Sequence, residues 1–148
     1  MTGDAKRVAA VCYRRVASGA EFLLVGTKSY PAWTFPKGKL DAEDGGDPRA
    51  AVAREAREEA GVTGRVASRP LTRYRYPAGE GQEHLVDAYL LEVDTQQEPR
   101  LHEREYRHPR WFPEEEARER LAENREPPYS EEHARVLAAA VRQIVATA

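Results

Sequence analysis

Three glutamates, Glu55, Glu58 and Glu59, lie in a short segment whose residues are typical of an α-helix. A helix turns by about 100° per residue, so the three carboxylates fall within an arc of about 100° on one side of it. An adjoining side carries the small and apolar residues that would pack on a sheet: Val52, Ala53, Ala56 and Ala60. The carboxylates should therefore lie beside the buried face of the helix and not opposite it.

Acidic side chains gathered in this way repel one another, and partial burial raises their pKa unless a positive charge is present. A hard divalent cation with oxygen ligands, such as Mg²⁺ or Mn²⁺, would relieve the repulsion. The alternative is a solvated helix face on which the acids pair with neighbouring arginines, of which the segment has several: Arg49, Arg54 and Arg57. The helix taken alone leaves both interpretations open.

A lysine–glycine loop precedes this helix. The chain has four lysines among its 23 basic residues, and two of them, Lys37 and Lys39, flank Gly38. Cations next to metal-bound carboxylates suit a polyanionic substrate, although a lysine-bearing surface turn is the simpler alternative for the loop in isolation. Loop and helix together indicate metal-assisted chemistry on a chain of phosphates.

The residues from Gly38 onward, with Arg54-Glu55-Ala56-Arg57-Glu58-Glu59-Ala60-Gly61-Val62, resemble the Nudix box, G-x5-E-x7-R-E-U-x-E-E-x-G-U, in which U is aliphatic. The second half matches at every specified position, with Ala56 as a small occupant of the first U. The first half departs, because Gly38 and Arg54 are two residues further apart than in the pattern. Counting back from Arg54 places Gly46 where the family has glutamate, and Asp44 and Asp47 are the nearby acids that could substitute for it.

This resemblance implies an α+β Nudix fold, an α/β/α sandwich in which helices flank a mixed β-sheet. It also implies hydrolysis of a nucleoside diphosphate linked to another moiety, or of a related pyrophosphate. In the family pattern Glu55, Glu58 and Glu59 would hold Mg²⁺ or Mn²⁺, and Arg54 would orient the glutamates through salt bridges.

Further site residues are expected outside the second half of the box. Glu105 is the candidate for a fourth carboxylate, acting as a metal ligand or a general base, and Glu103 is the second choice. Glu58 and Glu59 are the other candidate bases, so the identity of the base stays open. The candidate substrate-binding residues are Lys37, Gly38, Lys39 and Arg14.

Beyond the box, residues 6–14 and 107–112 are similar to segments of diphosphoinositol polyphosphate phosphohydrolases, whereas residues 33–38 and 105–107 are similar to diadenosine polyphosphate hydrolases. A dinucleoside polyphosphate or a diphosphoinositol polyphosphate is therefore the expected substrate. Oxidised nucleoside triphosphates and nucleotide sugars remain open as alternatives. The competing functional class is a non-catalytic Nudix module that binds a nucleotide or an inositol phosphate as a sensor.

Composition restricts the remaining possibilities. The 25 acidic and 23 basic residues give a net charge of −2, which argues against binding nucleic acid through a bulk basic charge. Cys12 is the one cysteine, so an intrachain disulfide and a cysteine-based zinc site are excluded. No apolar run approaches the roughly 20 residues of a membrane helix. We expect one domain over residues 1–148, a soluble cytoplasmic monomer or homodimer that binds a small-molecule polyphosphate, with neither nucleic acid nor membrane as a partner.

The elements that must position these residues follow from periodicity and from helix-capping signals. We expect strands over residues 7–16, 21–27, 65–76, 83–93 and 109–112, and a loop over residues 30–39. Asp47 should cap a helix that begins at Pro48 and ends at Gly61. Two more helices are expected, one over residues 113–122 and one that Ser130 caps and that runs through Ala146 to cover the sheet.

Overall fold

The computed structural model describes residues 6–27, 31–97 and 107–147. Within these ranges eight strands form a sheet with the central order β3-β2-β1-β7-β5, to which β4 is added on β1, β6 on β7 and β8 on β2. The strands are β1 (Arg7–Val16), β2 (Gly19–Gly26), β3 (Trp33–Thr34), β4 (Lys37–Lys39), β5 (Val62–Val66), β6 (Thr72–Gly79), β7 (Gln82–Gln96) and β8 (Arg110–Pro113). The pair β1–β7 is parallel and β1–β2 is antiparallel, so the sheet is mixed.

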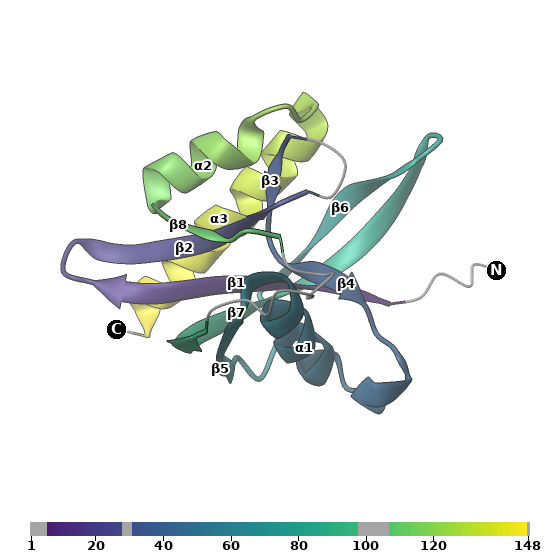
Figure 1. Ribbon diagram of the computed structural model, residues 1–148. Coiled ribbons are helices and arrows are strands. Elements are labelled where there is room, and N and C mark those ends of the chain that lie inside the picture. Colours follow the sequence, from purple (N-terminus) through teal and green to yellow (C-terminus); the bar gives the residue numbers. More distant parts are fainter. Residues whose placement is uncertain (1–5, 28–30, 98–106, 148) are drawn as a thin grey trace.

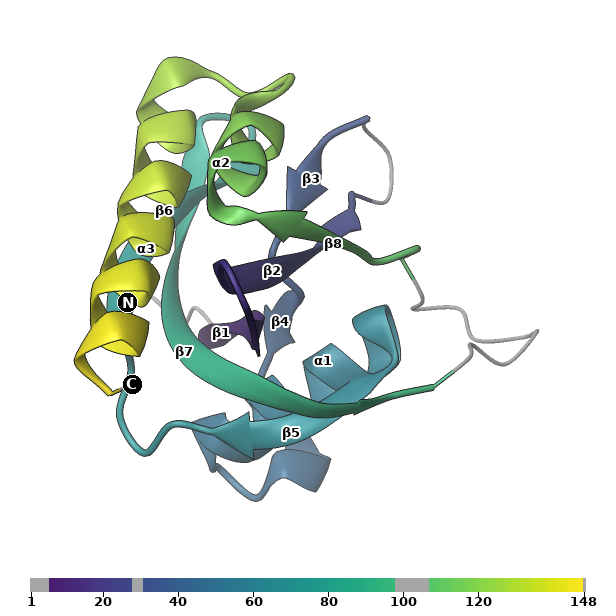
Figure 2. The same cartoon turned by 90° about the vertical axis from the view of Figure 1, so that its left-hand side faces the viewer.

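Helices cover both faces of this sheet (Figures 1 and 2). Alternate residues of a strand point to opposite faces, and β1 shows this directly. Its Val8, Ala10 and Cys12 join the apolar cluster of α1 (Pro48–Ala60), whereas Ala9, Val11 and Tyr13 join that of α2 (Glu114–Ala122) and α3 (Pro127–Ala146). The predicted α/β/α sandwich around a mixed sheet is confirmed. No helix in the described ranges is both long enough and apolar enough to cross a bilayer.

Helix α1 has the ends that its sequence predicts. The Asp47 side chain accepts a hydrogen bond from the backbone N–H of Arg49 at 3.0 Å, and Pro48 occupies the first turn. Gly61 ends the helix with φ of 69°, in the left-handed region that favours glycine. The Asp47 cap and Gly61 therefore set the start and end of α1, and with them the turn of the helix on which Glu55, Glu58 and Glu59 lie.

Three expectations about the strands and helices were wrong in detail. Residues 65–76 were expected to form one strand, but β5 ends at Val66 and β6 begins at Thr72. The expected loop over residues 30–39 contains the short strands β3 and β4, because Pro36 falls between them and interrupts neither ladder. Ser130 does not cap α3; the helix begins at Pro127, which suits a first turn, and the Ser130 hydroxyl donates to the Pro127 carbonyl at 3.1 Å.

Strand β4 carries the lysine–glycine loop into the sheet. It pairs antiparallel with the first residues of β1, with Gly38 opposite Val8 and Lys37 opposite Ala9. The Ala10 N–H also donates to the Pro36 carbonyl at 2.8 Å. Because α1 packs on this part of the sheet, the loop and the acidic side of the helix become neighbours.

A buried histidine of α3, His133, packs against the face of the sheet that lies opposite α1. His133 is 0% exposed, and its Nδ1 lies 2.7 Å from the Tyr129 carbonyl. Its ring is parallel to that of Phe35, with centroids 5.9 Å apart, and it also contacts Tyr74 and Tyr76. Burial in this aromatic cluster, helped by the charge of Arg125, lowers the pKa of His133 from 6.5 to about 3.

Acid should therefore weaken the fold through His133. Above pH 6.5 the His133 side chain is neutral in both the folded and the unfolded state. Below pH 6.5 the unfolded chain binds a proton at His133 and the folded chain does not. The free energy of unfolding therefore falls by up to about 1.4 kcal/mol per pH unit until the pH nears the folded-state pKa. We expect His133→Gln to be less stable than the wild type at pH 7.5, with a deficit that shrinks toward pH 4.5 in urea denaturation. A deficit that stays constant with pH would contradict this origin.

Candidate active site

A buried ion pair connects α1 to the segment that precedes it. Arg54 of α1 donates two hydrogen bonds to Asp44, from Nε to Oδ1 at 3.0 Å and from Nη2 to Oδ2 at 2.9 Å. The Asp44 carboxylate is 2% exposed and belongs to a short 3₁₀ helix, η1 (Ala42–Asp44). Nη2 of Arg54 also donates to the Lys39 carbonyl at 2.9 Å. Hydrogen bonds from Arg54 hold the pKa of Asp44 below its usual value.

The structure distinguishes between the two acids near the departure from the Nudix pattern. Asp44 contacts Arg54, whereas Asp47 caps α1. Gly46, which falls where the pattern has glutamate, has φ of 78° and lies in a turn of the longer connection. A positive φ of this kind favours glycine, so the two extra residues are accommodated by the turn while Asp44 supplies a carboxylate to Arg54.

The same guanidinium reaches the predicted glutamates. Its Nη1 donates to Glu55 Oε2 at 3.0 Å and to Glu58 Oε1 at 3.2 Å. Glu55 and Glu59 are 7% and 8% exposed, while the Glu58 side chain is 30% exposed. Glu59 Oε1 accepts the backbone N–H of Lys37 at 3.1 Å. The acids thus border the packed face of α1, as their helical spacing predicts.

Glu59 is the carboxylate whose protonation is most affected by this arrangement. Burial, together with the negative charge of Glu55, raises the pKa of Glu59 to about 7, against the opposing hydrogen bond and charge of Lys37. Within the described ranges no three carboxylate, imidazole or thiol groups are gathered closely enough to make a complete metal cluster. Glu103 and Glu105, the candidates for an additional carboxylate, lie outside the described residues.

Gly38 leaves room for one of these carboxylates. A Cβ placed on Gly38 would collide with the Glu55 carboxyl group. The absence of a side chain at this position therefore lets Glu55 lie directly against the backbone of β4. The flanking Lys37 places its Nζ 4.1 Å from the centroid of the Tyr76 ring.

A cavity of about 580 Å³ opens beside Glu59. Its walls come from β3, β4, β6, the residues before β8, the connection between α2 and α3, and the first turn of α3. They include Thr34, Lys37, Tyr76, Arg107, Arg125 and Tyr129. Nη1 of Arg125 donates to the Trp33 carbonyl at 2.9 Å, which holds the guanidinium at the wall. The charges of Lys37 and Arg125 outweigh the effect of burial and lower the pKa of Tyr76. The cavity therefore combines aromatic surface with positive charge.

Several of these wall residues were missed by the sequence analysis. Tyr76, Arg125 and Tyr129 belong to no motif, and Tyr76 of β6 is distant in the sequence from the other two, which lie just before and in the first turn of α3. Arg14 shows the opposite case, since it was a candidate for substrate binding but does not line this cavity. It is six positions further along β1 than Val8, the partner of Gly38. There it bonds to Glu21 at 2.7 Å and stacks 4.1 Å above Trp111.

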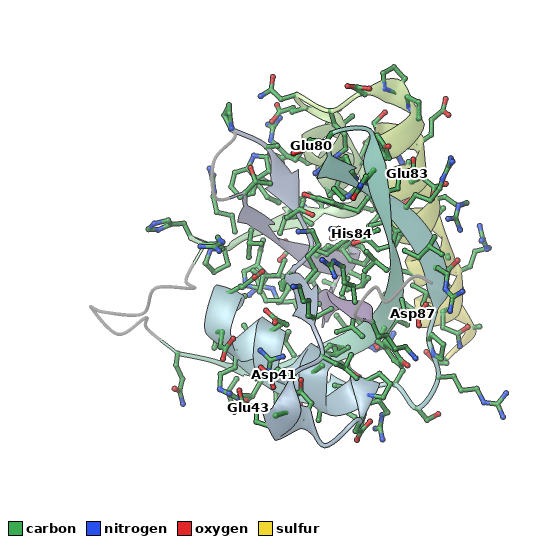
Figure 3. The ribbon with its side chains drawn as sticks, turned by 90° about the vertical axis from the view of Figure 1, so that its right-hand side faces the viewer. Asp41, Glu43, Glu80, Glu83, His84 and Asp87 are labelled. Atoms are coloured by element: carbon green, nitrogen blue, oxygen red, sulfur yellow. The ribbon has the colours of Figure 1, made fainter. Side chains whose placement is uncertain are left out.

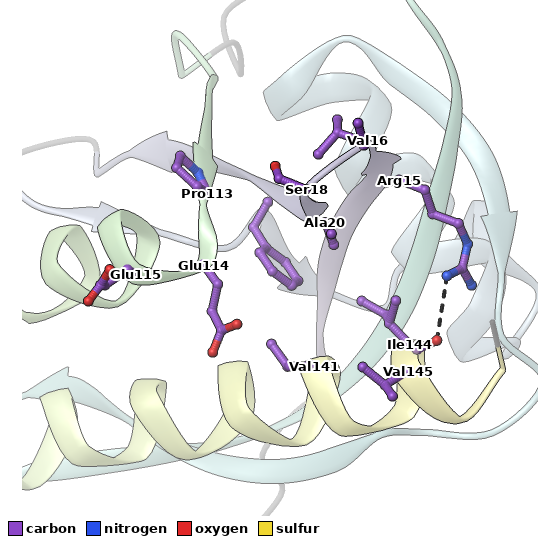
Figure 4. A pocket seen from close by; sticks show the side chains of 13 residues that line it. Arg15, Val16, Ser18, Ala20, Pro113, Glu114, Glu115, Val141, Ile144 and Val145 are labelled. Carbon is purple, nitrogen blue, oxygen red and sulfur yellow. Dashed lines mark hydrogen bonds between the residues drawn. The ribbon is translucent and has the colours of Figure 1, made fainter.

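A second cavity, of about 680 Å³, lies at the far end of β1 and β2 against α3 (Figure 4). Its lining is mainly apolar, with Val16, Phe22, Val141 and Ile144 among its residues. Arg15 reaches the Ile144 carbonyl at 3.5 Å at its edge. None of the predicted site residues lines it, so the acidic side of α1 and the cavity beside Glu59 form the candidate active site.

Comparison with known proteins agrees with this geometry. The NUDIX domain family model matches residues 5–139, and the chain therefore belongs to the Nudix family. It is 42% identical over 65 residues to diphosphoinositol polyphosphate phosphohydrolase 2 of Rattus norvegicus. The aligned segment covers 43% of this chain and 35% of that protein. The chain is 35% identical over 92 residues to diphosphoinositol polyphosphate phosphohydrolase 3-beta of Bos taurus, covering 62% of this chain and 52% of that protein.

The two matches thus span about a third and about half of the length of these curated relatives. Among solved structures, a binary complex of C. elegans Ap4A hydrolase superposes with a TM-score of 0.74 at 26% identity, covering 97% of this chain and 99% of that one. The similarity to the diphosphoinositol polyphosphate and Ap4A branch that the sequence predicted is confirmed.

Breaking the Arg54–Asp44 pair should be costly. We expect Asp44→Ala to lower the free energy of unfolding by about 3 kcal/mol, because it removes the most buried carboxylate that Arg54 contacts and the hydrogen-bond acceptor of its Nε. In that variant Glu55 and Glu58 keep only their bonds to Nη1. Glu43→Ala is the matched control: Glu43 lies 3.6 Å from the same Arg54, but its side chain is 65% exposed (Figure 3). This change should cost less than about 1 kcal/mol. Equal losses for the two variants in urea denaturation would contradict the assignment.

Proposed function

We propose that the chain is a Mg²⁺-dependent pyrophosphohydrolase that cleaves a P–O–P bond in a nucleoside or inositol polyphosphate. The observation that carries the proposal is a pair of neighbouring buried carboxylates, Glu55 and Glu59, of which Glu59 lines a cavity whose wall carries Lys37, Arg107 and Arg125. This reaction needs acidic side chains that bind a divalent cation next to basic side chains that bind phosphate.

The donor set fits a hard divalent cation. Glu55, Glu58 and Glu59 offer carboxylate oxygens, and the raised pKa of Glu59 reflects burial and a neighbouring negative charge that a cation would offset. We propose that these three residues hold Mg²⁺, for which Mn²⁺ can substitute, once Glu55 and Glu58 turn from their bonds with Arg54 toward a shared ion. Bound there, the ion would neutralise charge on a phosphoryl oxygen and lower the pKa of a coordinated water.

The side chains then divide the remaining work. In hydrolysis the water oxygen forms a bond to phosphorus, the bridging oxygen departs with the bonding electrons, and a carboxylate takes the proton of the water. Glu59 is the proposed base because its buried carboxylate lines the cavity and its Oε1 is held by the backbone N–H of Lys37. Glu58 is the alternative base within the described residues. Arg54 acts as a positioning residue, since it bonds to both Glu55 and Glu58.

The cationic wall suits the rest of the substrate. Lys37 and Arg125 would neutralise phosphates in the cavity, with Arg107 on the same wall. Lys39 and Gly38 lie on β4 next to the acids, and we keep them as candidate contacts. Tyr76 and Tyr129 offer ring surface to an organic moiety. Arg14 has no place in this arrangement.

A dinucleoside polyphosphate or a diphosphoinositol polyphosphate is the proposed substrate. The named activities of the rat, cattle and C. elegans relatives support both choices. The alternative of a non-catalytic sensor rested on Gly46 and the longer loop, and the contact of Asp44 with Arg54 supports the catalytic proposal, because Arg54 meets a carboxylate despite the longer loop. Cys12 is buried and unpaired, in keeping with the reducing cytoplasm that we propose as the location.

Gly38→Ala tests the metal site without touching a ligand. The added methyl group would displace the Glu55 carboxylate, so we expect Mn²⁺ affinity measured by isothermal titration calorimetry to fall about 10-fold or more. Gly26→Ala is the control, because its nearest neighbour would lie at an ordinary 3.6 Å. Unchanged affinity in Gly38→Ala, with the fold intact by circular dichroism, would contradict the proposed role of Glu55.

Glu59→Gln tests the chemistry. Glutamine still accepts the Lys37 N–H and relieves a buried charge, so the variant should unfold no more readily than the wild type. We expect phosphate or nucleotide release from Ap4A or from a diphosphoinositol polyphosphate to fall about 100-fold or more. Chelation of Mg²⁺ should abolish release by the wild type, and Glu119→Gln on α2 should behave like the wild type. Undiminished turnover in Glu59→Gln would overturn the assignment.

A further inference from the structure

Two walls of the cavity beside Glu59 come from elements that are distant in the sequence. The hairpin of β6 and β7 supplies Tyr76, Pro77 and Gly79 to one wall, and the start of α3 supplies Glu126 and Tyr129 to another. The hairpin projects from the body of the sheet (Figure 1). The width of the cavity therefore depends on how the hairpin is held relative to α3.

The backbone pairing of the hairpin becomes irregular near the cavity. The register shifts between Pro77 and Gly79. At the tip, Gly79, Glu80 and Gly81 have φ of 88°, 53° and 75°. The positive φ of Glu80 and Gly81 is that of a two-residue hairpin turn, but the register shift interrupts the ladder next to the cavity wall. The outer part of the hairpin thus needs support from outside its own ladder.

Contacts with α3 supply that support. Near the base of the hairpin, Glu132 accepts the backbone N–H of Arg75 at 2.7 Å, and Arg135 donates to the Arg73 carbonyl at 2.7 Å. Nearer the tip, the Tyr129 hydroxyl donates to Glu83 Oε2 at 2.7 Å. Glu83 is paired with Pro77 in the ladder, so this bond acts on the segment that forms the cavity wall.

We propose that Glu83 is a positioning residue for substrate binding, which holds the β6–β7 hairpin against α3 and fixes the Tyr129 ring in the cavity wall. The inference rests on the proposed function, in that the substrate occupies this cavity. Glu83 itself does not line the cavity and acts through Tyr129 and Pro77. A hydrogen bond to a carboxylate is stronger than one between neutral groups, which suits it to hold two otherwise separate elements.

The solvent exposure of the Tyr129–Glu83 hydrogen bond argues against a role of Glu83 in the stability of the whole fold alone. The bond between Tyr129 and Glu83 is exposed to solvent, and exposed polar contacts add little to the free energy of unfolding. Its loss should therefore appear as local opening of the hairpin and not as unfolding of the sheet. The consequence for function should fall on the binding of substrate, because the acids of α1 are not part of the contact.

The test uses the full chain with Glu83→Ala, Tyr129→Phe and the double variant. We expect KM for Ap4A or for diphosphoinositol pentakisphosphate, whichever the wild type cleaves, to rise about 5-fold with kcat within about 2-fold, and the double variant to match the single ones. Amide hydrogen exchange over residues 77–82 should quicken about 5-fold in the same variants. Glu83→Gln keeps an acceptor for Tyr129 but not the charge, so both readouts should fall between those of the wild type and Glu83→Ala. Glu80→Ala at the hairpin tip should leave both unchanged.

The two readouts separate the inference from the function on which it rests. A wild type that turns over none of the polyphosphates would defeat the proposed function, while hydrogen exchange would still decide whether Glu83 holds the hairpin. Unchanged exchange in Glu83→Ala would overturn the inference. Additive effects of the two substitutions, or a fall in kcat with KM unchanged, would overturn it as well.

Discussion

The site depends on one buried charge that must remain paired. Arg54 has a side chain that is 9% exposed, and its partner Asp44 is 2% exposed. An unpaired guanidinium at this depth is strongly unfavourable, so the loop that carries Asp44 is held to α1. The same guanidinium also bonds to the Lys39 carbonyl and to Glu55. One side chain thereby fixes β4, η1 and the acidic side of α1 relative to each other.

The arrangement around Arg54 also brings two buried carboxylates close together, so that their negative charges repel each other. Glu55 and Glu59 are held in a buried position where their charges oppose one another, with Glu55 against the glycine of β4 and Glu59 on the Lys37 backbone. Like charges so placed favour a bound cation. The neighbouring cavity carries positive side chains that favour an anionic ligand. A divalent ion and a polyphosphate would satisfy both sides of the site together.

The parts of this arrangement that follow from local chemistry could be predicted from the sequence. The caps of α1 and the arc of its glutamates depend on residues within a few turns of one another. Asp44 could only be named as one of two candidates, because the longer loop hides which acid meets Arg54. Tyr76, Arg125 and Tyr129 could not be found, because tertiary packing alone brings β6 and the start of α3 to Glu59. Arg14 was expected at the site, but the register of β1 carries it to Glu21.

The central claim is that α1 presents its acids to a shared divalent ion beside this cavity. Anomalous diffraction from a crystal soaked in Mn²⁺ tests it most directly. The account predicts an ion ligated by carboxylate oxygens of Glu55 and Glu59, on the side of α1 that faces the cavity. An ion bound elsewhere, or none while both carboxylates keep their contacts with Arg54 and the Lys37 backbone, would contradict it.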